Sequence, residues 1–170
     1  MDLLEKIRLK DSDTLYILGD VLDRGAHPIR VLLKLMEMPN VVLIAGNHEI
    51  MALECLDFLR KEITEASLAE IDDELLENLI LWEINGARTT MNEFRALDPD
   101  LQEDVIDYLK DALLYQEAEA GGKRYLLVHA GLGNFSEKKK FADYTIDCSA
   151  CHENGRLAAI CLDTGREFYS

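Results

Sequence analysis

The chain has 170 residues and a mass of 19.3 kDa, a length typical of one domain that can bury its own hydrophobic core. Its formal net charge of -15 argues against nucleic acid or an anionic membrane as the main partner. No stretch approaches the roughly 18 consecutive apolar residues of a membrane helix, and the first residues lack the basic and apolar regions of a signal peptide. We therefore expect a single cytoplasmic domain spanning 1–170.

The first part of the chain alternates helical patterns with short apolar runs. The expected elements are, in chain order, a helix over 3–9, a strand over 14–18, a helix over 29–38 and a strand over 40–45. Both apolar runs end at a glycine, Gly19 and Gly46, which is typical of buried parallel strands that lead into loops. This β-α-β pattern predicts a mixed α/β fold with the functional residues at the carboxyl ends of the strands.

The middle of the chain reads as a helical insert over about 48–112, and hairpins follow it. The expected helices of the insert cover 48–60, 66–83, 89–96 and 99–112. Two β-hairpins with glycine-containing turns are expected after the insert, with strands over 113–118 and 124–129, and over 156–163 and 166–169.

Four cysteines are present: Cys55, Cys148, Cys151 and Cys161. Cys148-Ser-Ala-Cys151-His152 matches the C-x-x-C-H pattern of c-type haem attachment. That chemistry requires export to an oxidising compartment, and no second cysteine pair follows at zinc-finger spacing. We interpret the match as a coincidence and expect free thiols.

Three glycine-flanked motifs follow expected strands: GDVLDRG at 19–25, GNHE at 46–49 and VHAGL at 128–132. Asp, Asn and His are the ligand types expected for divalent ions such as Mn, Fe or Zn. Taken singly, each residue has another interpretation: Asp20 as a helix N-cap, His129 as a core histidine and Arg24 as a surface ion-pair partner. Their occurrence together in this order favours one shared site.

The motifs resemble those of the calcineurin-like metallophosphoesterases, and within that family the phosphoprotein phosphatase branch of Ser/Thr phosphatases. Bacterial diadenosine tetraphosphatases look similar. The resemblance covers residues 13–42, the GNHE motif, the VHAG segment and the C-terminal hairpin. It implies a sandwich of two mixed β-sheets flanked by helices, here with a helical insert, and hydrolysis of a phosphate ester at a dinuclear metal centre.

The resemblance also implies a metal-binding role for three residues. Asp20 would bridge two divalent metal ions (Mn, Fe or Zn), and Asn47 and His129 would be ligands of the second ion. A hydroxide bridging the two ions would attack the phosphorus, because metal binding lowers the pKa of water towards neutrality.

A further three residues would act on the substrate if the resemblance holds. His48 would be the general acid that protonates the leaving alkoxide, and Asp23 would be hydrogen-bonded to it. Arg24 would bind the phosphate oxygens, for which its planar guanidinium is suited.

The sequence departs from the family pattern at two loops. It lacks the Asp-x-His loop that precedes GDxxDRG in the family and the Gly-His loop that follows HAG, so the first metal keeps only Asp20. His152 is the only nearby histidine that could replace a missing ligand, but we do not expect it to bind the metal. His27, just after the DRG motif, is expected to be a surface residue rather than a ligand. Residues missing from the sequence, a shortened gene or a degenerate protein would each explain these departures.

The pairing of DRG with GNHE favours a metal-dependent phosphatase acting on a phosphoprotein or a small phosphoester. Many Ser/Thr phosphatases have an arginine where this chain has Ala45, which weakens the assignment to protein substrates. Dinucleoside polyphosphates are the alternative substrate. The alternative outside the enzymes is a binding protein: a catalytically inactive descendant of the family that binds a partner through the acidic helical insert.

Overall fold

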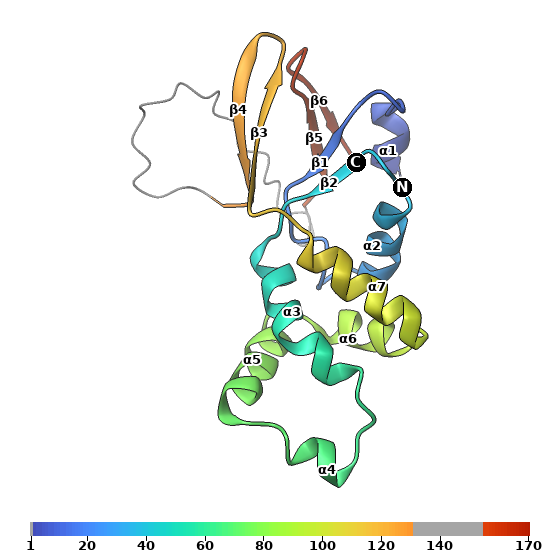
Figure 1. Ribbon diagram of the computed structural model, residues 1–170. Helices are drawn as coiled ribbons and strands as arrows, with labels where there is room; N and C mark the ends of the chain where they lie inside the picture. Colours follow the sequence, from blue (N-terminus) through green and yellow to red (C-terminus); the bar gives the residue numbers. More distant parts are fainter. Residues whose placement is uncertain (1, 131–154) are drawn as a thin grey trace, which may run out of the picture.

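A computed structural model describes residues 2–130 and 155–170. Its elements in chain order are α1 (Asp2–Ile7), β1 (Leu15–Ile17), α2 (Pro28–Met36), β2 (Val41–Leu43), α3 (Asn47–Leu59), α4 (Glu65–Leu68), α5 (Asp73–Ile84), α6 (Arg88–Arg95), α7 (Pro99–Lys110), β3 (Tyr115–Ala120), β4 (Lys123–Val128), β5 (Ala158–Cys161) and β6 (Arg166–Tyr169). The strands lie in one half of the molecule, and helices α3 to α6 gather in the other (Figure 1). The predicted α/β class is confirmed.

The two apolar runs near the start of the chain form a parallel pair, as predicted. Leu15 pairs with Val41 and Ile17 with Leu43, and helix α2 connects the two strands. A further parallel bridge joins Ile44 to Leu113, just before β3. The carboxyl ends of β1 and β2 therefore lie side by side, and the loops that follow them meet at one edge.

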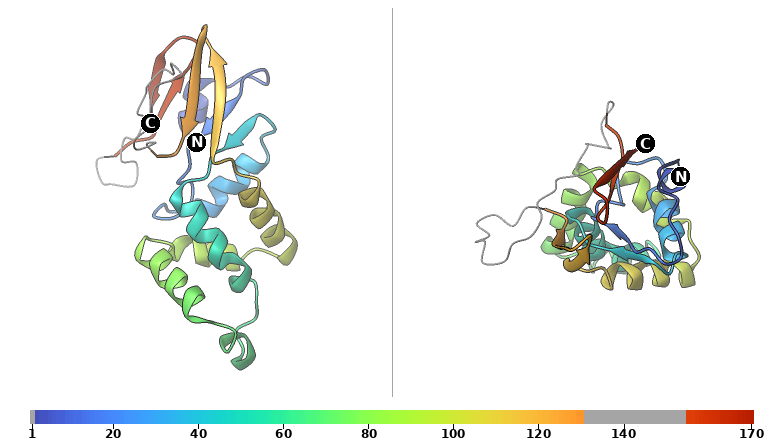
Figure 2. Two further views of the ribbon diagram at one scale, coloured as in Figure 1. Left: turned by 60° about the vertical axis from the view of Figure 1, so that its left-hand side comes forward. Right: turned by 90° about the horizontal axis from the view of Figure 1, so that it is seen from above.

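The remaining strands form the two predicted hairpins. β3 pairs with β4 and β5 with β6, both antiparallel, through turns in which Gly121, Gly122 and Gly165 have positive φ angles of 55°, 73° and 70°. Within the described residues the strands thus form three separate two-stranded sheets. The resemblance implies two larger mixed sheets instead. Figure 2 shows the two hairpins standing beside the β1–β2 pair.

One predicted helix is wrong in its extent. The helix expected over 66–83 is two helices, α4 and α5, separated by a short connection. The Asp72 side chain accepts a hydrogen bond from the Leu75 N–H and begins a new helix there, as aspartate at an N-cap commonly does. Among the described residues no helix combines the length and the apolar character needed to span a membrane.

A single cluster of buried side chains lies between the β1–β2 unit and the helices. Its members come from the loop after β1, from β2, and from helices α2, α3, α5, α6 and α7; among them are Leu22, Ile29, Leu43, Leu56, Trp82, Phe94 and Ile106. Leu22 lies in the GDVLDRG loop, so the loop is packed into the same core as the helical insert. The insert therefore supports the edge at which the motifs meet.

Candidate functional site

The buried carboxylate of Glu49 holds the two motif loops together. It lies in the first turn of α3 and accepts four hydrogen bonds from backbone N–H groups. The donors are Asp20, Val21, Leu22 and Gly46, at 2.8, 2.8, 3.1 and 2.8 Å. A buried carboxylate is costly unless it is fully hydrogen-bonded, and these donors meet that requirement. The position of Asp20 is thereby tied to the helix that begins at Asn47.

The loops approach so closely that both contacting residues must be glycine. A Cβ on Gly46 would lie 2.4 Å from Asp20 Oδ1, and a Cβ on Gly19 would lie 2.5 Å from the Gly46 nitrogen. Gly19 also has a φ of +78°, in the left-handed region that glycine adopts without strain.

Backbone strain is concentrated in the GDVLDRG loop. Asp20, Asp23 and Arg24 have φ angles of 54°, 68° and 57°, which non-glycine residues adopt at a cost. Each such residue costs of order 1–3 kcal/mol, and such residues cluster at functional sites. All three are residues to which the family resemblance assigns a role.

The side chains of Asp20 and His129 face each other across the two loops that carry them. His129 Nδ1 lies 2.6 Å from the Leu18 carbonyl oxygen, which can only accept, so Nδ1 carries the proton. His129 Nε2 lies 3.4 Å from Asp20 Oδ1. An imidazole nitrogen and a carboxylate oxygen are both ligand atoms for a divalent cation, and a histidine that binds a metal commonly donates its other ring N–H to a carbonyl oxygen, as Nδ1 does here.

Asn47 begins α3 with an exposed side chain, directly after the Gly46 that contacts Asp20. A carboxylate, an imidazole and an amide form a donor set that fits one divalent ion. Among the described residues, no group of three or more His, Cys, Asp and Glu side chains lies close enough to hold a metal ion.

His27 does not belong to this donor set. His27 Nδ1 lies 2.8 Å from Glu93 Oε1 on the surface, in agreement with the expected surface position. His152, Cys148 and Cys151 lie outside the described residues. The segment after the HAG motif, where the sequence lacks the Gly-His loop of the family, also lies outside them.

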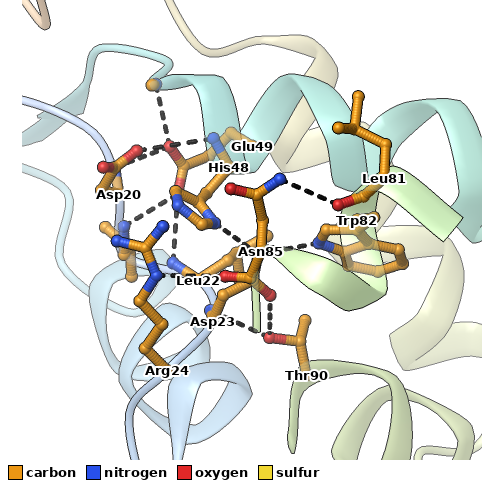
Figure 3. A network of polar contacts seen from close by, with 12 residues as sticks. Asp20, Leu22, Asp23, Arg24, His48, Glu49, Leu81, Trp82, Asn85 and Thr90 are labelled. Atoms are coloured by element: carbon orange, nitrogen blue, oxygen red, sulfur yellow. Dashed lines mark hydrogen bonds and ion pairs between the residues drawn. The ribbon is translucent and has the colours of Figure 1, made fainter. Parts of the chain in front are cut away.

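His48 and Asp23 form a buried pair. Their side chains are 2% and 0% exposed, and His48 Nδ1 lies 2.6 Å from Asp23 Oδ2. Trp82 Nε1 donates to the same oxygen at 2.8 Å, and the Thr90 hydroxyl donates to Oδ1 at 2.6 Å (Figure 3). Because both oxygens of Asp23 accept hydrogen bonds, Nδ1–H of His48 is the donor of the pair. Nε2 is then the ring nitrogen that Asp23 does not contact.

Arg24 is anchored by the turn that follows α5. Its Nε donates to the Asn85 carbonyl at 3.0 Å, and its backbone N–H donates to the Gly86 carbonyl at 3.2 Å. Gly86 has a φ of +102°, and a Cβ there would lie 2.8 Å from Arg24 Cγ. The Arg24 residue as a whole is exposed, so its charge is accessible to an anion.

Four functional contacts were missed by the sequence reasoning: those of Glu49, Trp82, Thr90 and Gly86. Glu49 had a signal, because a glutamate at the third position of a helix is half of a capping box. Trp82 and Thr90 had none, since they contact Asp23 from 59 and 67 residues away.

The chain is similar to several known phosphatases. The chain is 40% identical over 48 residues to fructose-1,6-bisphosphatase class 3 of Streptococcus agalactiae serotype Ia, a match covering 28% of this chain and 8% of that protein. A protein of the same name from Lactococcus lactis subsp. lactis matches over the same shares. The symmetrical bis(5'-nucleosyl)-tetraphosphatase of Acidovorax ebreus is 26% identical over 121 residues, which cover 71% of this chain and 34% of that protein. The chain thus spans about a third or less of each of these relatives.

The family comparison covers far more of the chain. A model of the calcineurin-like phosphoesterase family matches residues 1–160, which include all three glycine-flanked motifs and the residues that the structure brings together around Asp20 and His48. The chain therefore belongs to the calcineurin-like phosphoesterase family.

Proposed function

We propose that this chain is a metal-dependent phosphoesterase that hydrolyses phosphomonoesters of a phosphoprotein or a small molecule. The observation that carries the proposal is the buried Asp23–His48 pair at 2.6 Å, which shares the GDVLDRG loop with Asp20, the residue that faces His129 at 3.4 Å. Phosphate-ester hydrolysis needs a proton donor for the leaving group, which the first pair would supply, and positive charge for the phosphate, which a divalent ion held by the second pair would supply.

Each residue of the site has a part in this reaction. Asp20, His129 and Asn47 would hold a divalent ion (Mn, Fe or Zn), and a second ion would share Asp20. Such ions polarise the phosphate and lower the pKa of water that they bind. Arg24 would orient the phosphate through its guanidinium.

The Asp23–His48 pair would transfer a proton to the leaving group. His48 Nε2 would protonate the leaving oxygen, while Asp23 holds Nδ1–H and stabilises the ring when it is charged. Trp82 and Thr90 keep the Asp23 carboxylate in the orientation that this requires.

Two other substrates have specific support. The likeness to a symmetrical bis(5'-nucleosyl)-tetraphosphatase over 71% of the chain favours dinucleoside polyphosphates as the second candidate. The shorter likeness to fructose-1,6-bisphosphatase class 3 favours a sugar phosphate among small phosphoesters. The cytoplasmic location and the single-domain organisation expected from the sequence stay predictions.

The test is hydrolysis of p-nitrophenyl phosphate by the purified chain with added Mn²⁺. We expect turnover that is abolished by Asp20→Asn and by His48→Asn. His27→Asn is the matched control, because His27 is a surface histidine paired with Glu93, and it should retain full activity. Turnover that survives both site substitutions would refute the site.

Substrate preference then separates the candidates. We would compare kcat/KM for a phosphoserine peptide, fructose 1,6-bisphosphate and diadenosine tetraphosphate under the same conditions. Absence of turnover on every substrate, together with no bound transition metal by elemental analysis, would instead support the inactive descendant.

A further inference from the structure

The outer face of α5 carries a row of exposed apolar side chains. Leu76, Ile80 and Ile84 follow one another at intervals of four residues and are 47%, 50% and 79% exposed. This spacing places them on one side of the helix. Trp82 of the same helix is fully buried, so α5 has an inner apolar face as well as this outer one. We refer to Leu76, Ile80 and Ile84 as the α5 apolar row.

The surroundings of the α5 apolar row are strongly acidic. Residues 62–84 contain no Lys, Arg or His, and their acidic residues are all exposed: Glu62, Glu65, Glu70, Asp72, Asp73, Glu74, Glu77 and Glu83. Two of these carboxylates are paired, Glu70 with Lys61 and Glu83 with Arg88, both partners lying outside the segment. On the helix itself, Asp73, Glu77 and Leu81 form the next row, so carboxylates border the apolar row directly.

Apolar side chains rimmed by charge are typical of a protein interaction surface rather than of an ordinary solvated helix. A second copy of this chain would bring the same carboxylates to the contact, and like charges brought face to face are unfavourable. A helix with apolar residues at every third and fourth position and Lys or Arg beside them would match both features. We propose that the α5 apolar row binds a cationic amphipathic helix of a protein partner.

The position of α5 connects this surface with the site already described. α5 packs against α3 at the margin of the helical half of the molecule (Figures 1 and 2). Its inner face supplies Trp82 to Asp23, and the turn after it holds Arg24. A partner on the outer face would thus contact the same helix that supplies Trp82 to the Asp23–His48 pair. The binding itself does not depend on the proposed hydrolytic activity.

The first test measures binding of a fluorescently labelled peptide to the full chain by anisotropy. The peptide is built from Leu and Lys in a helical amphipathic pattern and has about 18 residues, or about five turns. We expect saturable binding that weakens at least about tenfold in Ile80→Ser/Ile84→Ser, because each buried isoleucine contributes enough apolar area for such a factor. Val31→Ser on α2 is the matched control, since Val31 is 51% exposed, and it should bind as the unmodified chain does.

The second test addresses the acidic rim. Glu77→Lys should weaken binding of the same peptide. Asp104→Lys makes an equal charge change at an exposed position of α7 and should weaken binding much less. Raising the salt concentration should weaken binding to the unmodified chain, because exposed charges are screened. Circular dichroism would establish that each variant is folded.

Three outcomes would overturn the inference. Equal binding of a peptide with the same composition in scrambled order would mean that charge alone attracts the peptide. Equal binding to Ile80→Ser/Ile84→Ser would remove the apolar row from the interaction. Light scattering that shows a dimer, converted to a monomer by these two substitutions, would assign the face to a second copy of the chain.

Discussion

The carboxylate of Asp23 is bonded on both oxygens by groups from three separate parts of the chain. His48 and Trp82 contact Oδ2 at 2.6 and 2.8 Å, and Thr90 donates to Oδ1 at 2.6 Å. The Thr90 hydroxyl also accepts the Asp23 backbone N–H at 2.9 Å. Because the carboxylate is fully buried, these donors offset its desolvation and also fix its direction. The orientation of His48 therefore depends on residues distant in the sequence.

Thr90→Val should impair turnover through this chain of contacts. Valine keeps the shape of threonine but cannot donate to Asp23, and we expect kcat to fall about ten- to a hundredfold through misorientation of His48, with KM little changed. Thr90→Ser should restore most of kcat. The control is Thr89→Val, the neighbouring threonine. A kcat for Thr90→Val equal to that of Thr89→Val would contradict the positioning role.

Two cysteines of the described chain differ in their environment. Burial raises the pKa of the Cys55 thiol to about 11, and the Glu54 carboxylate contributes in the same direction. Hydrogen bonds with the Thr164 side chain and backbone lower the pKa of the Cys161 thiol. The thiolate is the reactive form, so the fraction able to react near neutral pH is larger for Cys161.

Iodoacetamide at about pH 7.5 should therefore modify Cys161 well before Cys55 in the folded protein. Peptide mass spectrometry after timed quenching would measure both rates. In urea the environments are lost, and the two rates should converge. Equal rates in the folded protein would show that the environment of Cys55 does not protect it.

At the scale of elements, the turn between α5 and α6 is the feature that links the helical insert to the substrate side of the site. Asn85 and Gly86 offer their carbonyl oxygens to Arg24, and Gly86 lies against the Arg24 side chain. A residue with a Cβ at this turn would both strain the backbone and displace the arginine.

Gly86→Ala should accordingly raise KM for phosphate esters several-fold and lower the free energy of unfolding by roughly 1–2 kcal/mol. Gly122→Ala is the matched control, because Gly122 also has a positive φ, +73°, but a Cβ there would meet no atom within 4 Å. Both variants should lose stability in urea unfolding, and only Gly86→Ala should change KM. An unchanged KM in Gly86→Ala would mean that the position of Arg24 does not contribute to substrate binding.

Much of this element-level structure was predictable, and the misses have physical causes. The β1 and β2 strands and the loops after them follow from apolar runs that end at glycine, and both hairpins follow from their glycine-containing turns. The division of 66–83 into α4 and α5 depends on the cap at Asp72, a local signal that apolar periodicity does not register. The contacts of Trp82 and Thr90 with Asp23 depend on tertiary packing, for which a single sequence carries no pattern.

At the scale of the whole molecule, one hydrophobic core supports both the motif loops and the helical insert. Leu22 from the first loop, Leu43 from β2 and Trp82 from α5 belong to the same buried cluster. Ordering of the site and folding of the described helices are therefore coupled. A ligand that binds only the ordered site should stabilise the whole fold, by about 2.7 kcal/mol at a concentration one hundred times its Kd.

Addition of Mn²⁺ should raise Tm for this reason. Asp20→Asn and His129→Gln should each reduce or remove the rise, because each takes away one donor of the pair that is 3.4 Å apart. His27→Gln should leave it intact. Differential scanning fluorimetry would measure the three variants beside the unmodified chain. A Tm rise of the same size in the two donor variants would mean that Mn²⁺ binds elsewhere.

The carboxylate of Glu49 has a consequence for the motions of the site. Backbone amides from both motif loops share this single acceptor group, and the group is carried by the first turn of α3. When that turn opens, all of these amides lose their acceptor at once, so their hydrogens become exchangeable in one event rather than one after another. The two loops then behave dynamically as one unit, although 23 residues separate Leu22 from Gly46 along the chain.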